Sequence, residues 1–291
     1  MTTGRGYQGP ASRRGSAAAF QPLVSIRADD GATAEIRRHG AHVTSWRPAP
    51  GGEERLFLSS TSEFGASAAI RGGVPIIFPQ FGPNGPLQQH GFARRTTWGL
   101  GGIGRASNGM AEADFVLRDS PDTRAVWDHA FMAVTSVRIV GDQLAVTFTV
   151  ENLGEAPFDF TAALHTYLRV HDVDDVSITG LQGSRYRVPG SDALIEDEEE
   201  RVRVGDYLER IYVGAPSRIV LHEGSRSMLV MAEGFPDAVL WNPGPVRAAS
   251  VPDIEPGGER SFVCIEAAVV QTPVTLGPRR RWMGTQTLTA R

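Results

Sequence analysis

Cysteine is almost missing from this sequence of 291 residues, because Cys264 is the only one. An intrachain disulfide is therefore excluded, and a reducing compartment is indicated, so we expect a cytoplasmic location. Long apolar runs are missing as well, since none approaches the roughly 20 residues that a membrane span requires. We therefore expect no membrane partner.

The chain also lacks an excess of positive charge. Its 29 lysine and arginine residues stand against 33 acidic residues, which gives a formal net charge of -4. Such a chain has no broad basic field to attract nucleic acid, so we expect no nucleic-acid partner. A small anionic ligand would need a local basic pocket instead.

The N-terminal segment lacks the apolar core of a signal peptide, although it contains several arginines. Residues 1–20 are rich in glycine, alanine and serine, and we interpret them as a flexible extension. The remaining residues, 21–291, have ordinary globular composition. All-β folds of this size commonly form one unit, so we expect a single β-sandwich domain.

Helical periodicity is nearly absent, and short runs with strand character follow one another from Leu23 onward. The clearest pair is Phe131–Val140 and Gln143–Glu151, because Gly141-Asp142 between them suits a type II′ turn. Short helical turns are expected at Thr61–Ala68 and near residues 204–208. Further strands are expected at Leu23–Ala28, Ala32–Arg37, Ala113–Leu117, Asp159–Val170, Arg218–Leu221, Met228–Met231, Ala238–Trp241 and Phe262–Val270. This pattern predicts an all-β fold, a large antiparallel β-sandwich.

One expected strand has a distinctly polar face. Alternation along residues 162–171 places His165, Tyr167, Arg169 and His171 together and the leucines opposite. Such a face suits either the solvent or a sugar-binding cleft, and the segment alone does not decide between them.

A single acid interrupts the apolar segment Phe262–Val270. Both faces of this segment are otherwise apolar, which predicts a central, buried strand carrying Glu266. A buried carboxylate is costly unless it has a partner or a raised pKa, and both conditions are common at catalytic sites. A structural carboxylate tied to an arginine or to backbone amides is the alternative.

Two glycine-containing segments carry arginines. One holds Arg71 beside two glycines, and the other holds Gln88, His90 and Arg94 around Gly91. Glycine allows the close approach of a ligand, and arginine is suited to bidentate contacts with phosphate. Each segment on its own is equally typical of a simple turn.

Short motifs are spread from Leu23 to Val270. They read Arg71-Gly72-Gly73-Val74-Pro75, His90-Gly91-Phe92-Ala93-Arg94, Leu164-His165-Thr166-Tyr167, Arg210-Ile211-Tyr212, Val239-Leu240-Trp241-Asn242-Pro243 and Cys264-Ile265-Glu266. In this order they resemble the hexose-6-phosphate mutarotases of the aldose 1-epimerase superfamily. The resemblance implies a large two-sheet β-sandwich with a cleft on one concave sheet.

The resemblance also implies roles for individual residues. His165 resembles the general acid, Glu266 the general base, and His90 a contact near the reacting end of the sugar. Arg71 and Arg94 resemble the arginines that hold the phosphate. Further substrate contacts are expected at Gln88, Glu209, Trp241 and Asn242. The implied reaction interconverts the α and β anomers of a hexose 6-phosphate, with glucose 6-phosphate expected, by ring opening and closure without a cofactor.

The sequence departs from the family pattern at Glu209, where members carry an aspartate that contacts sugar hydroxyls. The longer side chain leaves the identity of the sugar more open than the reaction. Three alternatives also stay open: a mutarotase for unphosphorylated aldoses, a non-catalytic sugar-phosphate-binding protein, and a glycoside hydrolase using Glu266 and Glu209. His39 and His42 lack the cysteine or carboxylate cluster of a metal site, so we expect no metal, and we expect a monomer.

Overall fold

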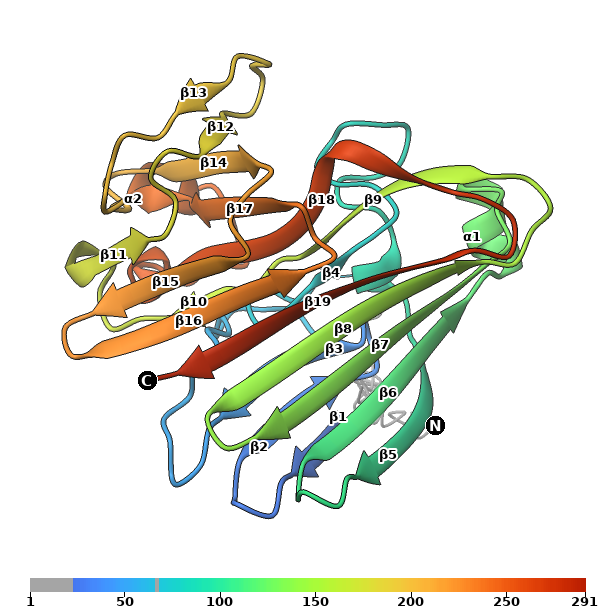
Figure 1. Ribbon diagram of the computed structural model, residues 1–291, viewed down its shortest axis with the longest axis horizontal. Helices are drawn as coiled ribbons and strands as arrows, with labels where there is room; N and C mark the ends of the chain where they lie inside the picture. The colour runs from blue at the N-terminus through green and yellow to red at the C-terminus, as the bar shows by residue number, and fades with distance from the viewer. Residues whose placement is uncertain (1–22, 66–67) are drawn as a thin grey trace, which may run out of the picture.

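The computed structural model describes residues 23–65 and 68–291, whose regular secondary structure is almost entirely antiparallel β-sheet (Figure 1). The expected N-terminal extension, residues 1–20, lies outside the described residues. One sheet of eight strands, here called the site sheet, comprises β4 (Ile76–Ile77), β9 (Phe158–Leu164), β10 (Tyr167–Arg169), β12 (Arg185–Arg187), β13 (Ile195–Glu196), β14 (Leu208–Val213), β17 (Asp237–Asn242) and β18 (Phe262–Leu276).

A second eight-stranded sheet, here called the back sheet, lies across the core from the site sheet. It comprises β5 (Gly99–Arg105), β6 (Ala111–Arg118), β7 (Phe131–Val140), β8 (Gln143–Asn152), β11 (Val176–Thr179), β15 (Arg218–Glu223), β16 (Arg226–Glu233) and β19 (Arg281–Ala290). A three-stranded sheet comprises β1 (Leu23–Arg27), β2 (Thr33–Arg37) and β3 (His42–Arg47). The predicted antiparallel β-sandwich is confirmed.

The core lies between the two large sheets, where alternate side chains of each strand point inward. In β7 buried and half-buried residues alternate along the whole strand, as the period of two requires. Phe78 follows β4, and its ring centroid lies 5.6 Å from that of Phe148 on β8 and 5.4 Å from that of Phe160 on β9. These aromatic contacts join the back sheet to the site sheet.

Most of the expected strands are present. The hairpin of β7 and β8 turns at Gly141, whose φ of 56° is the positive angle that the predicted turn needs. β18 lies between β17 and β9, and its residues Phe262–Val269 are buried on both faces, as predicted.

The expected strand Asp159–Val170 is not continuous, and this difference shapes the site. β9 ends at Leu164 and β10 begins at Tyr167. At the break, the N–H of His165 donates to the carbonyl of Pro75, outside the β9–β18 ladder. The faces still alternate as predicted: Leu164, Leu168 and Val170 are buried in the core, whereas His165 and Tyr167 line the opposite face. Only the continuity of the strand differs, because the chain changes hydrogen-bonding partners in its middle.

The expected helical turns were also wrong. The described residues of 61–68, and residues 204–208, contain no helix, whereas short helices occur at α1 (Pro121–Val126) and α2 (Gly244–Ala248). α1 begins where Ser120 and Thr123 form a reciprocal capping box and Pro121 takes the first helical position. Six residues are too few for helical periodicity to show in the sequence.

Candidate active site

A cavity of about 630 Å³ opens on the outer face of the site sheet. Its floor includes residues of β10, β14, β17 and β18, and its walls come from loop residues within 61–63, 68–71, 81–95 and 250–253. Most of the predicted site residues line it. These are His165, Glu266, Arg71, His90, Arg94, Glu209 and Trp241.

His165 and Glu266 meet because of the strand register. Leu164 pairs with Ala267 across β9 and β18, so the residue after Leu164 lies beside the residue before Ala267. Nε2 of His165 is 3.4 Å from Oε1 of Glu266. The two residues are only 7% and 2% exposed, so their interaction is little screened by water.

Burial favours the uncharged form of both groups. It raises the pKa of Glu266 well above its ordinary value, and the nearby carboxylate of Glu209 raises it further. Burial lowers the pKa of His165 well below its ordinary value, and the positive charges of Arg94 and Arg71 act in the same direction. Both shifts favour the state in which the carboxyl carries the proton next to a neutral imidazole.

His90 presents a hydrogen-bond donor to the cavity. Its Nδ1 accepts the backbone N–H of Gly82 at 3.2 Å, so the neutral ring carries its proton on Nε2. Burial and the neighbouring charges of Arg94 and Arg71 lower the pKa of His90 to about 3, which keeps the ring neutral. Its backbone φ of 69° is costly for a residue with a Cβ, a feature that is frequent at functional sites.

Aromatic rings surround His165. The ring of Tyr167 stacks on that of His165 with centroids 4.9 Å apart and planes 8° from parallel. Trp241 meets His165 edge to face at 5.7 Å. Such rings hold the imidazole in one orientation and offer apolar surface to the carbon face of a sugar.

Three arginines gather at one end of the cavity. Arg71 pairs with Asp253, with its Nε and Nη2 both 3.1 Å from Oδ1, and its Nη1 donates to the hydroxyl of Tyr167 at 2.8 Å. Arg94 donates to the carbonyl of Gln89, and Arg95 lines the same end. Burial and the like charges of Arg95 and Arg71 lower the pKa of Arg94 to about 10. This end of the cavity is suited to an anion.

The loop that carries Arg71 is held from beneath by two buried histidines. His39 Nε2 donates to the carbonyl of Ala68, and His42 Nε2 donates to that of Gly72, each at 2.7 Å. These histidines are therefore braces for the loop. The described residues contain no group of three or more histidine, cysteine, aspartate or glutamate side chains that could hold a metal ion.

Glu209 lines the cavity from β14, where it pairs in register with Trp241 of β17. Its Oε2 accepts a hydrogen bond from the hydroxyl of Tyr207 and lies 3.5 Å from Nη1 of Arg247. The guanidinium of Arg247 stacks over the Tyr207 ring at 3.6 Å. Partial burial raises the pKa of Glu209, and Arg247 opposes that shift.

The structure does not bring Gln88 and Asn242 to the cavity. Gln88 is exposed, and its Oε1 accepts a hydrogen bond from Arg95. Asn242 is buried, and its amide donates to the carbonyls of Glu259 and Phe262 while its oxygen accepts the N–H of Gly244. The side chain of Asn242 therefore has a structural role, which corrects its assignment as a substrate contact. For Gln88 the assignment stays a prediction, since its exposed side chain contacts Arg95 of the cavity.

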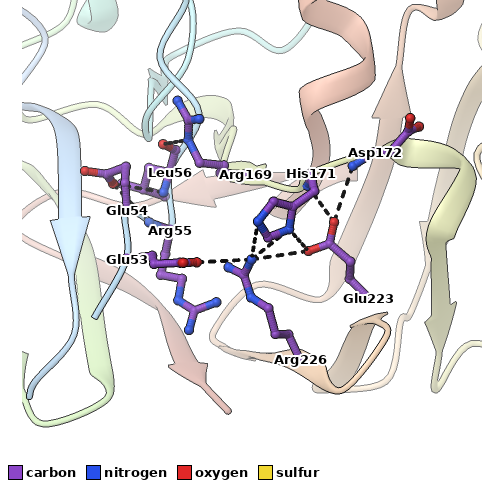
Figure 2. A network of polar contacts seen from close by, with 9 residues as sticks. All are labelled: Glu53, Glu54, Arg55, Leu56, Arg169, His171, Asp172, Glu223 and Arg226. Carbon is purple, nitrogen blue, oxygen red and sulfur yellow. Dashed lines mark hydrogen bonds and ion pairs between the residues drawn. The ribbon is translucent and has the colours of Figure 1, made fainter. Parts of the chain in front are cut away.

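Two other residues of the expected polar face also lie elsewhere. Figure 2 shows Arg169 and His171 in a separate network, in which His171 Nδ1 is 3.2 Å from Glu223 Oε2. Nε of Arg169 donates to the carbonyl of Leu56. Of that face, only His165 and Tyr167 line the cavity.

Several cavity residues carried no sequence signal that we recognised. Asp253 lies in a loop without a motif, and Arg95 follows a motif whose last residue is Arg94. Tyr167 was placed on the right face but was given no role. A role for Asp253 could be assigned only once its contact with Arg71 was known.

Solved structures share this fold. The Salmonella typhimurium protein YeaD, provisionally described as a mutarotase, has a TM-score of 0.83 and 30% identity over 92% of this chain and 90% of its own. Galactose 1-epimerase from Lactobacillus acidophilus NCFM has a TM-score of 0.70 at 15% identity, over 92% of this chain and 94% of its own, which shows the fold alone. Fold and site therefore define a β-sandwich of the mutarotase class.

The chain belongs to the aldose 1-epimerase family, whose pattern matches residues 22–289. A relative from Cenchrus ciliaris is 35% identical over 92% of this chain and 84% of its own length. A relative from Escherichia coli K12 is 35% identical over 81% of this chain and 79% of its own. Both carry the provisional name glucose-6-phosphate 1-epimerase. In the described part of the chain, no helix is long and apolar enough to cross a membrane.

Proposed function

We propose that this protein interconverts the α and β anomers of a hexose 6-phosphate, with glucose 6-phosphate as the substrate to test first. The observation that carries the proposal is the contact between His165 Nε2 and Glu266 Oε1 on the cavity floor. Mutarotation requires two proton transfers, at O1 and at the ring oxygen O5. Both oxygens are bonded to C1, so the groups that serve them must lie side by side.

The reaction proceeds by ring opening. The carboxylate of Glu266 takes the proton from the O1 hydroxyl while protonated His165 gives a proton to O5. The C1–O5 bond breaks, and C1 and O1 become an aldehyde. Rotation about C1–C2 presents the other face of the carbonyl, and the same two groups act in reverse as the ring closes. Each positioned transfer typically contributes about 10²–10⁴-fold to the rate.

The pair needs no proton from outside the cavity. Ring opening starts with an imidazolium and a carboxylate and ends with a neutral imidazole and a carboxylic acid, so the pair keeps one proton throughout. Burial favours the second state when the cavity is empty. A bound anion offsets the charges of Arg71 and Arg94, which otherwise lower the pKa of His165, and so favours the reactive state.

The remaining groups orient the sugar. The Nε2–H of His90 serves as a donor toward O1, where negative charge develops as Glu266 removes the proton. Arg71 and Arg94 hold the 6-phosphate at the cationic end. Binding energy gained there fixes the position of C1 over the acid–base pair. Glu209 accepts hydrogen bonds from sugar hydroxyls at the opposite rim.

The test measures anomer exchange of glucose 6-phosphate by NMR line shape or with a coupled dehydrogenase. Glu266→Gln and His165→Asn should each lose at least about 100-fold in kcat, because each removes one proton transfer. As a control, Arg280→Gln at an exposed position should keep the wild-type rate. Wild-type exchange in either site variant would remove that residue from the mechanism.

The cationic end separates this proposal from a mutarotase for unphosphorylated aldoses. A free aldose carries no charge that could compensate the arginines there. Arg71→Ala and Arg94→Ala should each reduce the preference for glucose 6-phosphate over glucose. An unchanged preference in both variants would favour free aldoses as the substrates.

A further inference from the structure

The charges at the cationic end of the cavity do not balance. Arg71, Arg94 and Arg95 contribute three positive charges, and Asp253 contributes one negative charge. Among the described residues, only Arg71 of these three arginines has a carboxylate partner, namely Asp253. Arg94 and Arg95 instead contact amide oxygens, those of Gln89 and Gln88.

Among the described residues, the other acids of the cavity form no ion pair with these three arginines. Glu63 is exposed at the rim, where water screens its charge. Glu209 is held by Tyr207 and Arg247, and Glu266 belongs to the acid–base pair. The cationic end by itself therefore carries a net charge of about two positive units, counted from the three arginines and Asp253.

We propose that Arg95 is a third phosphate-binding residue and that Asp253 sets the charge of this end, so that the cavity selects the doubly charged form of a hexose phosphate. This inference rests on the proposed function. A phosphate dianion neutralises the excess of two charges, whereas a monoanion leaves one guanidinium without a counter-charge in a partly buried site.

The contacts of Arg71 support a distinct role for Asp253. Its Oδ1 accepts from both Nε and Nη2 of Arg71, so one edge of the guanidinium is already occupied. Arg71 keeps further N–H groups on Nη1 and Nη2 for a ligand. Asp253 thus orients Arg71 and at the same time repels any anion that binds there. Arg95 restores the attraction that Asp253 removes.

The experiment compares glucose 6-phosphate with glucose 6-sulfate, which has the same shape and one negative charge. Anomer exchange is followed by NMR for both substrates. Wild type should have the higher kcat/KM for the phosphate. Arg95→Gln should lower kcat/KM for the phosphate about tenfold, which corresponds to about 1.4 kcal/mol, and should narrow the preference for phosphate over sulfate.

Asp253→Asn should act in the opposite direction. Asparagine keeps an oxygen that accepts from Arg71 but removes the negative charge, so KM for both anions should fall several-fold. Arg95→Lys keeps the charge without the planar fork and should recover part of the loss seen in Arg95→Gln. Arg280→Gln, in the exposed turn between β18 and β19, serves as the matched arginine control with an unchanged preference.

Two results would overturn the inference while leaving the proposed function in place. One is an active wild-type enzyme whose preference for phosphate over sulfate is the same in Arg95→Gln. The other is a raised KM for the phosphate in Asp253→Asn, as expected if Asp253 only positions Arg71. A wild-type protein that does not accelerate exchange of glucose 6-phosphate would instead refute the proposed function itself.

Discussion

The raised pKa of Glu266 links the acid–base pair to the stability of the fold. In the unfolded chain this carboxyl ionises at its ordinary value of 4.5, whereas in the folded protein burial keeps it protonated to much higher pH. Between these two pKa values the folded state binds one more proton than the unfolded state. Glu266 therefore makes the free energy of unfolding fall as pH rises, by about 1.4 kcal/mol per pH unit.

Glu266→Gln removes this dependence with almost no change in shape. The useful window lies above pH 6.5, where the three buried histidines with lowered pKa values, His42, His90 and His165, contribute progressively less to the pH dependence. Their contribution is common to both proteins and cancels in the difference. From pH 6.5 to 8 the free energy of unfolding of the variant should rise by roughly 2 kcal/mol relative to that of wild type, as long as Glu266 stays protonated in the folded protein.

Urea unfolding followed by tryptophan fluorescence at several pH values measures this difference. A difference in the free energy of unfolding that is the same at every pH reflects the amide itself. It does not affect the pH dependence of that difference. Curves that stay parallel from pH 6.5 to 8 would show that Glu266 is ionised when folded. The reasoning about a shared proton would then be wrong, even if Glu266→Gln were inactive.

Three further outcomes follow from the structure. Asn242→Ala should reduce the free energy of unfolding, measured in urea, by about 2–4 kcal/mol, because it leaves buried backbone groups without hydrogen-bond partners. If the variant kept full stability and had a raised KM, Asn242 would instead be a sugar contact. Gly91→Ala should cost more than about 1–2 kcal/mol, since φ is 65° and the new Cβ would lie 2.2 Å from the carbonyl oxygen of Phe78; an unchanged melting temperature would contradict this. The pH profile of kcat should be flat near neutrality. The value of kcat should fall in acid, where His165 and Glu266 together take up a second proton, and in alkali, where they lose the shared proton. A half-maximal change of kcat between pH 6 and 7 would exclude this pair as the catalytic groups.

Local patterns in the sequence were sufficient for most of the strands. Alternation predicted β7 and β8, and Gly141 predicted their turn, because both depend on residues that are neighbours in the chain. The burial of β18 on both faces followed from its composition. The family resemblance, which was drawn from motifs in a particular order along the chain, was confirmed by the family pattern that matches residues 22–289.

Long-range contacts were beyond such patterns. At the break between β9 and β10 the N–H of His165 donates to the carbonyl of Pro75, which lies far away in the sequence. Arg169 and His171 likewise contact the distant residues Leu56 and Glu223 and not the cavity. The same limit applies to Asn242, which lies in a motif bordering the site but is occupied by backbone groups.

The sequence by itself determined an all-β sandwich and the residue types for acid–base chemistry on a sugar phosphate, because strand periodicity and short motifs are local properties. Only the tertiary structure decided which of those residues share a cavity. Strand register placed His165 beside Glu266, and loop closure brought Asp253 to Arg71 across 182 positions of the chain. The charge balance of the cationic end depends on that second contact, which no neighbouring residues encode.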